Sequence, residues 1–482
     1  MALSPASETA QPSPAQVLGP RFGLQPTVER ELLRKLAMKR TTGSHSKWLG
    51  RLLSAACWIL FLVQGAAQTD LPTVAEAYYS HDSRLQTLIQ EAIENNPSLM
   101  ESRARYRAAL QRVPQVSSLP DPMLNYTQFI RSAETRVGPQ VNSFTLSQSF
   151  PWFGTLDLKA QIALKTALAE YEAHHSRVDD LANRVKQAYY EISYLDQSLS
   201  ITAEEQALLE HYEQLAQNRY SSGQGLQQAI IRIQAEMTRL VDRTKRLRRQ
   251  RDSASARLDT LSDRRPGAPI GLVGTIPLPE IRLDLEELYT LSEANRPELR
   301  ARRARVEKSE QEIRLAKKDF WPQFTAGFGF TNVGERDDPA GRLLPPPDNG
   351  KDAYMLSFGI KLPLWRDKYR AGVMEATESV IAERKGYLNQ RNEIEFSIRD
   401  QSLRLDTLKE QIDLLDRVLL PQAEEALLST ESAYETGQVG SLDLLDGERF
   451  LLQVKLMGAR YATDFLQALS HLERAIGSRF PQ

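Results

Sequence analysis

The chain has 482 residues and a formal net charge of −1, so its bulk electrostatics does not indicate a nucleic-acid-binding protein. Cys57 is its one cysteine, which excludes a disulfide within the chain and a cysteine-based metal site. Charged residues make up 26% of the chain, and long stretches rich in Ala, Leu, Gln, Glu and Arg are typical of helices that pack on one another.

The first part of the chain reads as an extension followed by a targeting segment. Residues 1–37 show no packing pattern, and we expect them to be a non-structural extension. From Met38 on, basic residues precede an apolar run of 12 residues, 52–63, and small residues ending at Ala67 follow it. This pattern predicts a secretory signal peptide over residues 38–67.

Two readings of this region stay open. Translation starts either at Met1 or at Met38, and we favour Met38 because the signal-peptide pattern begins there. Cys57 lies inside the apolar run with Ser54 three residues before it, whereas a lipoprotein processing site needs Leu or a similar residue at that place. We therefore expect no lipid anchor.

A helical pattern begins near Leu85, and strand patterns follow it. The first pair of strand segments is 123–130 and 141–150, and a second pair is 323–330 and 354–362. Aromatic residues alternate with small or polar ones over ~9–11 residues, as in transmembrane β-strands. Lipid does not tolerate open sheet edges, so a membrane barrel requires several chains, and three would supply twelve strands. The alternative is two soluble hairpins.

Each strand pair is followed by a very long helical pattern. As one helix, residues 155–219 would extend ~100 Å at ~1.5 Å per residue, which favours a tall bundle over a globule. Apolar residues step by threes and fours over 181–202, and nearly so over 398–419. Such heptad stripes indicate paired coiled-coil helices.

The chain reads as two tandem copies of this arrangement, 85–262 and 284–478, joined by an irregular connector at 263–283. In both copies the long helix ends in Tyr-x-x-Gly-Gln, and the glycines supply the permissive backbone of a helix end and tight turn. The candidate tip residues are Tyr220, Gly223 and Gln224 in the first copy and Tyr434, Gly437, Gln438 and Gly440 in the second.

Two acids follow the second tip. Ser441 is expected to cap the returning helix, which places Asp443 in its first turn and Asp446 on the same face. The carboxylates have two readings, a functional pair or a complement to the helix dipole. The first copy has Ala229 and Arg232 at these positions, so it supplies no such pair.

The residue pattern argues against an enzyme. There is no phosphate-binding loop, no nucleophile motif and no histidine spacing that binds zinc. His174 and His175 read as a solvated pair, and the basic run 246–251 reads as a solvated helix face. We expect no catalytic residue, no cofactor and no metal site.

The two copies of helix, strand pair, long helix, Tyr-x-x-Gly tip and returning helix, behind a signal peptide, resemble the TolC-like outer membrane efflux protein family, or outer membrane factors. The resemblance covers nearly all of residues 85–478, and the tips and the repeat are its most specific parts. Leu-Pro-Asp-Pro at 119–122 and Phe-Pro-Trp-Phe-Gly at 150–154 are most similar to the metal-efflux (CzcC/CusC-like) branch.

This resemblance implies a mainly α fold with a membrane β-barrel. The family forms a homotrimer whose twelve-stranded barrel, four strands per protomer, lies in the outer membrane lipid of a Gram-negative bacterium. A long α-helical coiled-coil tunnel extends into the periplasm. Its helical-hairpin tips dock a periplasmic adaptor (membrane fusion) protein, which joins an inner-membrane pump of the RND type or another type.

The resemblance also implies a role for the acids. Asp443 and Asp446 match, in their spacing from the tip glycine, acids that ring the periplasmic aperture in relatives. Some relatives lock this aperture with an Asp after the first tip and an Arg after the second tip's Gly. Ala229 and Val439 stand at those places, so any resting lock uses other bonds.

The expected function is the passive outer membrane channel of a tripartite efflux system, with heavy-metal cations as the cargo suggested by the branch. Two alternatives stay open: the outlet of a protein secretion system, and, from a different class, a secreted coiled-coil scaffold. The cargo is chosen by the pump and the adaptor, so the duct's own sequence does not name it.

Overall fold

The structure, a computed structural model, describes residues 82–478, all of which belong to one unit, Val74–Gln482. The expected extension (1–37) and signal peptide (38–67), with Cys57, lie outside the described residues. Within residues 82–478, no helix combines the length and the apolar character that a membrane crossing needs.

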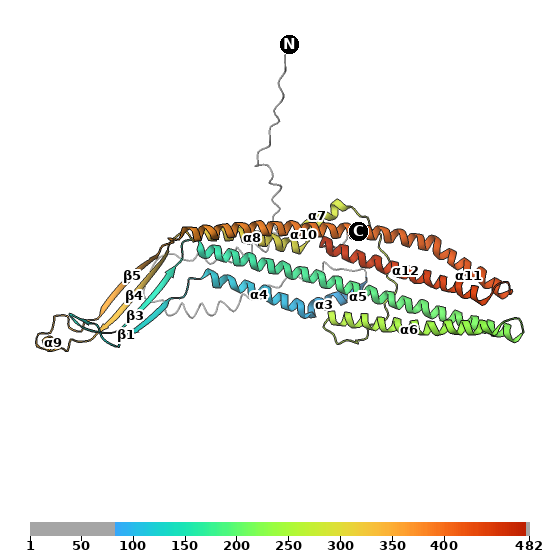
Figure 1. Ribbon diagram of the computed structural model, residues 1–482, viewed down its shortest axis with the longest axis horizontal. Coiled ribbons are helices and arrows are strands. Elements are labelled where there is room, and N and C mark those ends of the chain that lie inside the picture. Colours follow the sequence, from blue (N-terminus) through green and yellow to red (C-terminus); the bar gives the residue numbers. More distant parts are fainter. Residues whose placement is uncertain (1–81, 479–482) are drawn as a thin grey trace, which may run out of the picture. The chain divides into compact units, whose positions relative to one another are not determined.

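Helices make up most of the described chain (Figure 1). The first half contains α3 (Ser83–Asn95), α4 (Pro97–Ser117), β1 (Met123–Gln128), β2 (Glu134–Thr135), β3 (Gly138–Phe150), α5 (Thr155–Ser221) and α6 (Gln227–Leu261). The second half contains α7 (Leu285–Asn295), α8 (Pro297–Lys318), β4 (Gln323–Val333), α9 (Pro339–Leu343), β5 (Ala353–Lys361), α10 (Arg366–Leu414), η2 (Leu415–Leu419), α11 (Leu420–Glu435) and α12 (Ser441–Ile476).

Helices α4 and α8 both begin with a proline at the first helical position, but only α4 has a side-chain cap. Asn96 caps α4 by accepting the N–H of Ser98 at 3.0 Å, and Pro97 occupies the first helical position. Arg296 and Pro297 take the corresponding places at α8. Proline suits this position because its missing N–H would have no partner within the helix.

Four main strands form one antiparallel sheet in the order β1-β3-β4-β5, and the short β2 pairs with β3. All four expected strands are present. Strand β3 begins three residues earlier than expected and β4 ends three residues later, whereas β2 was not predicted. Strands β1 and β5 form the two edges and are exposed along their whole length.

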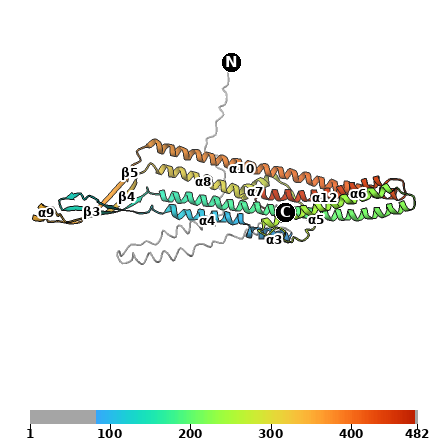
Figure 2. The same cartoon turned by 60° about the horizontal axis from the view of Figure 1, so that its bottom comes forward.

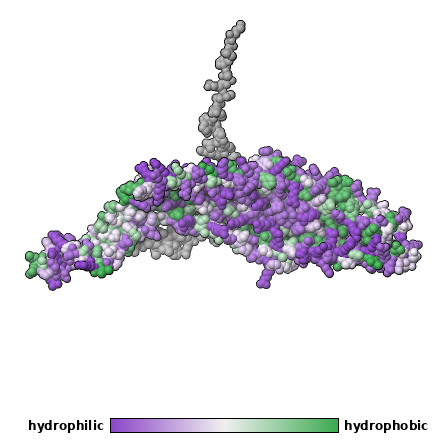
Figure 3. Space-filling model, viewed as in Figure 1, coloured by the Kyte–Doolittle hydropathy of each residue, from purple (hydrophilic) through white to green (hydrophobic). Residues whose placement is uncertain are grey.

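The strand register separates the sheet into two chemically different faces. Phe144 lies opposite both Tyr126 and Phe330, and Phe328 lies opposite Leu146. The large apolar residues of the first face are Leu124, Tyr126, Phe144, Leu146, Phe150, Phe324, Phe328, Phe330, Tyr354, Leu356, Phe358 and Ile360. The other face carries mainly small and polar residues, among them Asn125, Thr127, Ser143, Thr145, Ser147, Ser149, Thr325, Gly327, Gly329, Ser357 and Gly359. Green and white side chains gather over the strands in Figure 3.

The long helices lie side by side in a row (Figures 1 and 2). Next to the strands the order of contacts is α4, α5, α8 and α10, and toward the tips it is α6, α5, α12 and α11. Helices α4 and α6 therefore occupy one edge of the row, and α10 and α11 occupy the other. Strand β1 follows α4 and β5 precedes α10, so each edge helix is joined to an edge strand.

The long helix expected at 155–219 is present as α5, but its counterpart in the second half is interrupted. A π-helical turn, η2, separates α10 from α11 just before Pro421. Proline has no N–H to donate, so the helical hydrogen-bond ladder is broken there. The packing of Leu415 against Gly458 fixes this turn on α12: a Cβ at Gly458 would meet Leu415 Cδ2 at 3.2 Å.

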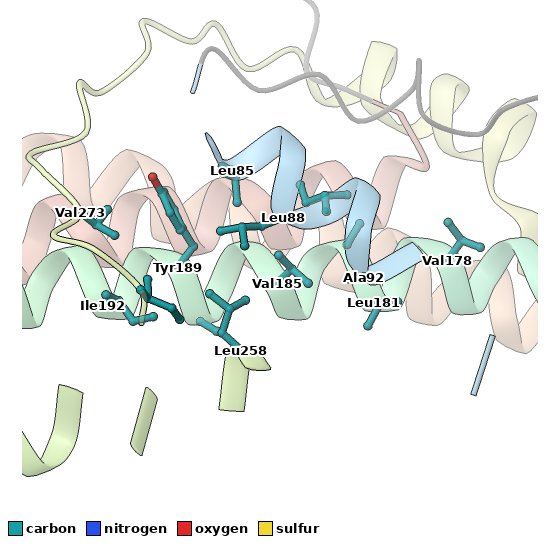
Figure 4. Close-up of a cluster of buried hydrophobic side chains, with 14 of the residues drawn as sticks. Leu85, Leu88, Ala92, Val178, Leu181, Val185, Tyr189, Ile192, Leu258 and Val273 are labelled. Carbon is teal, nitrogen blue, oxygen red and sulfur yellow. The ribbon is translucent and has the colours of Figure 1, made fainter. Parts of the chain in front are cut away.

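Short helices and the connector complete the core at mid-length. Leu85, Leu88 and Ala92 of α3 pack onto Val185 and neighbouring residues of α5 (Figure 4). Val273, from the irregular stretch between α6 and α7, joins this cluster, so that stretch is part of the packed core although it forms no helix or strand.

Candidate functional site: the two hairpin tips

Both long helices end in the same hydrogen-bonded turn. The N–H of Gln224 donates to the carbonyl of Arg219 at 2.9 Å, and that of Gly223 donates to Tyr220 at 3.0 Å. In the second tip the corresponding pairs are Gln438 with Ala433 at 2.9 Å and Gly437 with Tyr434 at 3.0 Å. The two glycines have φ of +74° and +80°, a conformation that costs glycine little. This is the Schellman helix ending, and it explains the glycine at each tip.

The helix that returns from the second tip is capped differently than expected. The prediction of Ser441 as N-cap was wrong: the cap is Gly440, and Ser441 is the first helical residue. Asp443 accepts the N–H of Gly440 at 3.0 Å through its carboxylate. Asp443 thus caps the start of the helix at the positive end of its dipole, which is the interpretation of this acid as a complement to the helix dipole.

Asp446 lies one turn further along α12, and its carboxylate is not isolated. Arg449 donates from Nη1 to Asp446 Oδ1 at 3.1 Å and from Nη2 to Glu236 Oε2 of α6 at 2.6 Å. Burial disfavours the Glu236 carboxylate, but hydrogen bonds from Arg449 and Arg239 outweigh this, and the pKa of Glu236 is lowered. Asp443 and Asp446 are both exposed, with Arg449 beside Asp446.

The tyrosines at equivalent positions of the two tips have different surroundings. Tyr220 is 49% exposed, whereas Tyr434 is 5% exposed. The guanidinium of Arg219 lies over the Tyr434 ring, 5.0 Å from its centroid, and Nη1 donates to the Tyr434 carbonyl oxygen. Arg219 therefore joins the end of α5 to the end of α11, so it links the two tips within one chain.

The remaining tip residues face solvent. Gly223, Gln224, Gly437, Gln438 and Gly440 are all exposed. Next to them, Leu226 has 73% of its surface exposed although it is apolar. The tips thus present backbone, amide and apolar groups together, which is a composition suited to protein contact.

Away from the tips, the first helical hairpin (α5 and α6) packs against the second (α11 and α12), and this interface contains residues that the sequence did not single out. Glu205 of α5 and Glu448 of α12 are buried, and burial raises the pKa of both carboxyl groups. A signal was present in the sequence. Glu448 interrupts the apolar helical spacing of Leu444, Leu445, Leu451 and Leu452, and an acid at a core position of a helix needs a buried polar partner.

Two other expectations about polar residues met different outcomes. The prediction of a solvated His174–His175 pair was wrong: His174 is buried, and its Nδ1 lies 2.7 Å from Ser102 Oγ. Burial, followed by the nearby arginines, lowers the pKa of His174, which favours the neutral ring.

In the basic run 246–251, Arg251 is not solvated as expected, because it forms an ion pair with Asp196 at 2.5 Å. Among residues 82–478, no cluster of His, Cys, Asp and Glu has the arrangement of a metal site.

Comparison with known proteins gives one family. The family model described as "Outer membrane efflux protein" matches residues 88–262 and 288–478. The chain is 25% identical over 279 residues to the toxin and drug export protein A of Aggregatibacter actinomycetemcomitans, covering 55% of this chain and 59% of that protein. It is 22% identical over 191 residues to the cobalt-zinc-cadmium resistance protein CzcC of Cupriavidus metallidurans, covering 40% of this chain and 42% of that protein.

Solved structures share the fold. The outer membrane protein VceC of Vibrio cholerae superposes with a TM-score of 0.69, covering 85% of this chain and 100% of VceC at 17% identity. The matches to the two curated relatives span only about three fifths and two fifths of their lengths, and the relatives differ in the cargo that their names give.

Proposed function

The chain belongs to the outer membrane efflux protein family, and on this premise we propose that it is the outer membrane duct of a tripartite efflux system. In this role the protein conducts cargo passively, and an inner-membrane pump supplies the energy through a periplasmic adaptor. The observation that carries the proposal is the two-faced sheet with open edges, attached to a row of long helices that also has open edges.

The apolar face of the sheet supports insertion in a membrane. Its large side chains are exposed, as illustrated by Tyr354 at 70%, Leu356 at 73% and Phe358 at 83%. Such a surface is costly in water and favourable in lipid, whereas the small and polar opposite face suits an aqueous lumen. The pairing of one apolar face with one polar face is expected of a barrel wall.

The edges of the sheet support assembly from several copies. Among residues 82–478, strands β1 and β5 each present one unpaired side, and lipid requires every backbone group to be paired. Because the four main strands alternate in direction, β5 of one copy and β1 of the next would be antiparallel. Three copies close a barrel of twelve strands, and the two tandem copies in each chain would then give six similar units around one axis.

The edges of the helical row support the same head-to-tail closure. Helix α6 carries nine basic and four acidic residues, whereas α11 carries four acidic residues and no basic ones. Both helices run beside the tips, at opposite edges of the row. Closing a ring brings α6 of one copy beside α11 of the next, so opposite charges meet. The helices then enclose a tunnel below the barrel.

In this assembly the tips form the periplasmic end of the tunnel. The exposed residues Gly223, Gln224, Gly437 and Gln438, with Tyr220, are the surface that we propose for adaptor docking. Gly440 lies at the same end, while Tyr434 acts through its contact with Arg219.

Asp443 and Asp446 from three copies would bring six carboxylates to the aperture. Such a ring raises the local concentration of cations through its field, and it needs no metal-ligand geometry to do so. Arg449 beside Asp446 reduces this field, so Asp443 contributes the larger uncompensated share.

Heavy-metal cations are the cargo that we propose, with support from the CzcC match and the segments at 119–122 and 150–154. The match to a toxin and drug export protein favours a second candidate, the outlet of a secretion or drug-export system. A growth test of a strain that lacks the gene, across metal ions, antibiotics, detergents and dyes, separates the two. Sensitivity limited to metals supports the first candidate, and broad sensitivity supports a general duct.

The proposal of a membrane duct also competes with a secreted coiled-coil scaffold. Extraction of membranes with carbonate tests this directly. A duct stays with the outer membrane, whereas a scaffold is washed out, and that result would refute the barrel.

A further inference from the structure

All three tryptophans among residues 82–478 lie where the sheet meets the long helices. Trp152 lies between β3 and α5, Trp321 between α8 and β4, and Trp365 between β5 and α10 (Figure 1). Trp321 is 51% exposed and Trp365 is 76% exposed, so packing in a core does not explain the position of these large rings.

The tryptophans continue the apolar face of the sheet beyond the strands. The ring of Phe324, which belongs to that face, stacks on Trp152 with centroids 5.9 Å apart, and Trp152 stacks on Trp321 at 4.7 Å. Tryptophans in membrane proteins gather at the level of the lipid head groups. Strand β4, with 11 residues, extends roughly 36 Å at ~3.3 Å per residue, which is enough to cross the apolar layer with a tilt.

Basic residues gather at the same end of the sheet. The four segments that join the strands to the helices, 114–122, 151–159, 314–322 and 361–370, contain eight basic and four acidic residues. The loops at the opposite end of the strands, 129–137 and 334–352, contain five basic and six acidic residues. Of the eight basic residues, only Arg370 forms an ion pair within residues 82–478, with Asp367 at 3.3 Å. The positive charge of the other seven is available to an external anion.

Lys318 lies at the centre of this junction. Its carbonyl oxygen accepts the N–H of Trp321 at 3.0 Å, and its ammonium group lies beside Gly154, where a Cβ would be 3.7 Å from Nζ. Gly154 is the N-cap of α5 and has no side chain to cap it, so this ammonium lies near the positive end of the helix dipole. Asp157, in the first turn, accepts a hydrogen bond from Gln161 and forms no ion pair with Lys318.

We propose that this junction binds the phosphate head groups of anionic phospholipids. The phosphate contacts Lys318 near the start of α5, Lys317 adds charge, and the rings of Trp152 and Trp321 contact the lipid next to its head group. Positive charge alone would suit any anion, but here it adjoins an aromatic surface that is continuous with the apolar face, and a phospholipid matches both.

This inference rests on the proposed duct, in which the tips lie in the periplasm. The junction is then at the periplasmic leaflet of the outer membrane, and bound phospholipids would fix the depth of the barrel in the bilayer. The loops at the other end of the sheet have neither the tryptophans nor the surplus of positive charge, so we assign the site to one leaflet.

The tryptophans themselves report which lipids contact the junction. Trp48 and Trp58, the other two in the chain, fall in the segment 38–67 that we expect to be removed as a signal peptide. The protein is purified from outer membranes and reconstituted in phosphatidylcholine vesicles. Brominated acyl chains, which quench indole fluorescence, are carried either by phosphatidylglycerol or by phosphatidylcholine. At equal mole fraction, brominated phosphatidylglycerol should quench several-fold more effectively, and this preference should shrink at high salt.

Paired variants connect the preference to the junction. Lys317→Gln with Lys318→Gln should abolish most of the preference for phosphatidylglycerol, whereas Lys317→Arg with Lys318→Arg should keep it. The matched control is Arg131→Gln with Arg342→Gln, which removes two exposed charges from the loops at the opposite end of the sheet. This control should quench like the wild type. An equal loss in the control would mean that net charge alone attracts the lipid, and it would overturn the site.

The same measurement separates the lipid site from the proposed duct. Equal quenching by the two brominated lipids in the wild type overturns the site and leaves the membrane barrel in place, because the tryptophans still contact lipid. Quenching by neither lipid contradicts the duct as well, since the junction then lies away from a bilayer. A preference that persists in the glutamine variant overturns the assignment of the phosphate to Lys318.

Discussion

Arg219 holds Tyr434 from the neighbouring hairpin, through its ring and through its backbone carbonyl. This contact distinguishes two tips that have the same Tyr-x-x-Gly-Gln sequence. We expect Arg219 to hold the second hairpin against the first.

Replacing Arg219 by Ala should lower stability by about 1–2 kcal/mol, because a charged hydrogen bond and a cation–π contact are lost together. Tyr434→Leu removes only the ring, so the coupling in a double-mutant cycle should be about 0.5–1 kcal/mol. Thermal unfolding of the four proteins in detergent measures both values. Arg219→Lys keeps the charge but not the planar group and should recover only part of the loss. Strict additivity would mean that the ring contact contributes nothing.

The tip glycines offer a matched pair. Gly437→Ala and Gly223→Ala both place a side chain at positive φ, which costs about 1–2 kcal/mol. A Cβ at Gly437 would also lie 3.0 Å from Arg219 Nη2, whereas one at Gly223 would meet nothing within 4 Å. The change at Gly437 should therefore lower the unfolding temperature more, and this difference should vanish in an Arg219→Ala background. Equal shifts in both backgrounds would contradict the contact.

Neighbouring positions of β5 test the two faces of the sheet. Leu356→Lys puts a charge on the apolar face and should cost ~2–4 kcal/mol if that position lies near the middle of the bilayer. Met355→Lys puts the same charge on the opposite face, where it should be tolerated. The fraction of chain recovered in carbonate-resistant membranes measures the difference. Equal recovery of the two variants argues against a lipid-facing side.

The charged edges of the helical row predict a specific rescue. Reversing Arg232 and Arg248, both exposed on α6, to Glu should lower the fraction of assembled trimer, most strongly at low salt. Reversing Glu424 and Glu425 of α11 to Lys in the same chain should restore it. Native mass spectrometry in detergent counts the copies. If the combined variant does not recover the trimer, α6 of one copy does not lie against α11 of the next.

The acids after the second tip predict a change in cation block. Asp443→Asn with Asp446→Asn should weaken the block of single-channel conductance by multivalent cations added from the periplasmic side, since the ring loses its charge. Asparagine keeps an oxygen for the N–H of Gly440, so the helix start should survive. Arg449→Gln should strengthen the block by freeing Asp446. Asp252→Asn, exposed on α6, serves as the control, and unchanged block in the acid variants would refute the ring.

Much of the architecture could be predicted from local sequence. Period-two alternation identified the four main strands, and their faces follow from that period because successive side chains point to opposite sides. Gly223 and Gly437 indicated the helix ends because few other residues adopt their positive φ angles. The family resemblance, based on these same local features, agrees with the family match.

Local sequence was less informative where two adjacent residues suit the same structural position. Ser441 and Gly440 both suit an N-cap, and the choice fell on Gly440 because the carboxylate of Asp443 reaches its N–H. The interruption of the second long helix followed the same logic. The heptad stripe over 398–419 predicted no break, and the π-helical turn before Pro421 depends on how Leu415 packs against Gly458.

What the sequence by itself determined was the kind of each element, because backbone angles and side-chain periodicity are set by residues a few positions apart. Only the tertiary structure decided which polar residues would be buried together. Tyr220 and Tyr434 share a motif but differ in exposure, and Glu205 and Glu448 are both buried although each is an acid. Burial depends on which helices meet, and that is fixed by the packing free energy of the whole row, which no short segment contains.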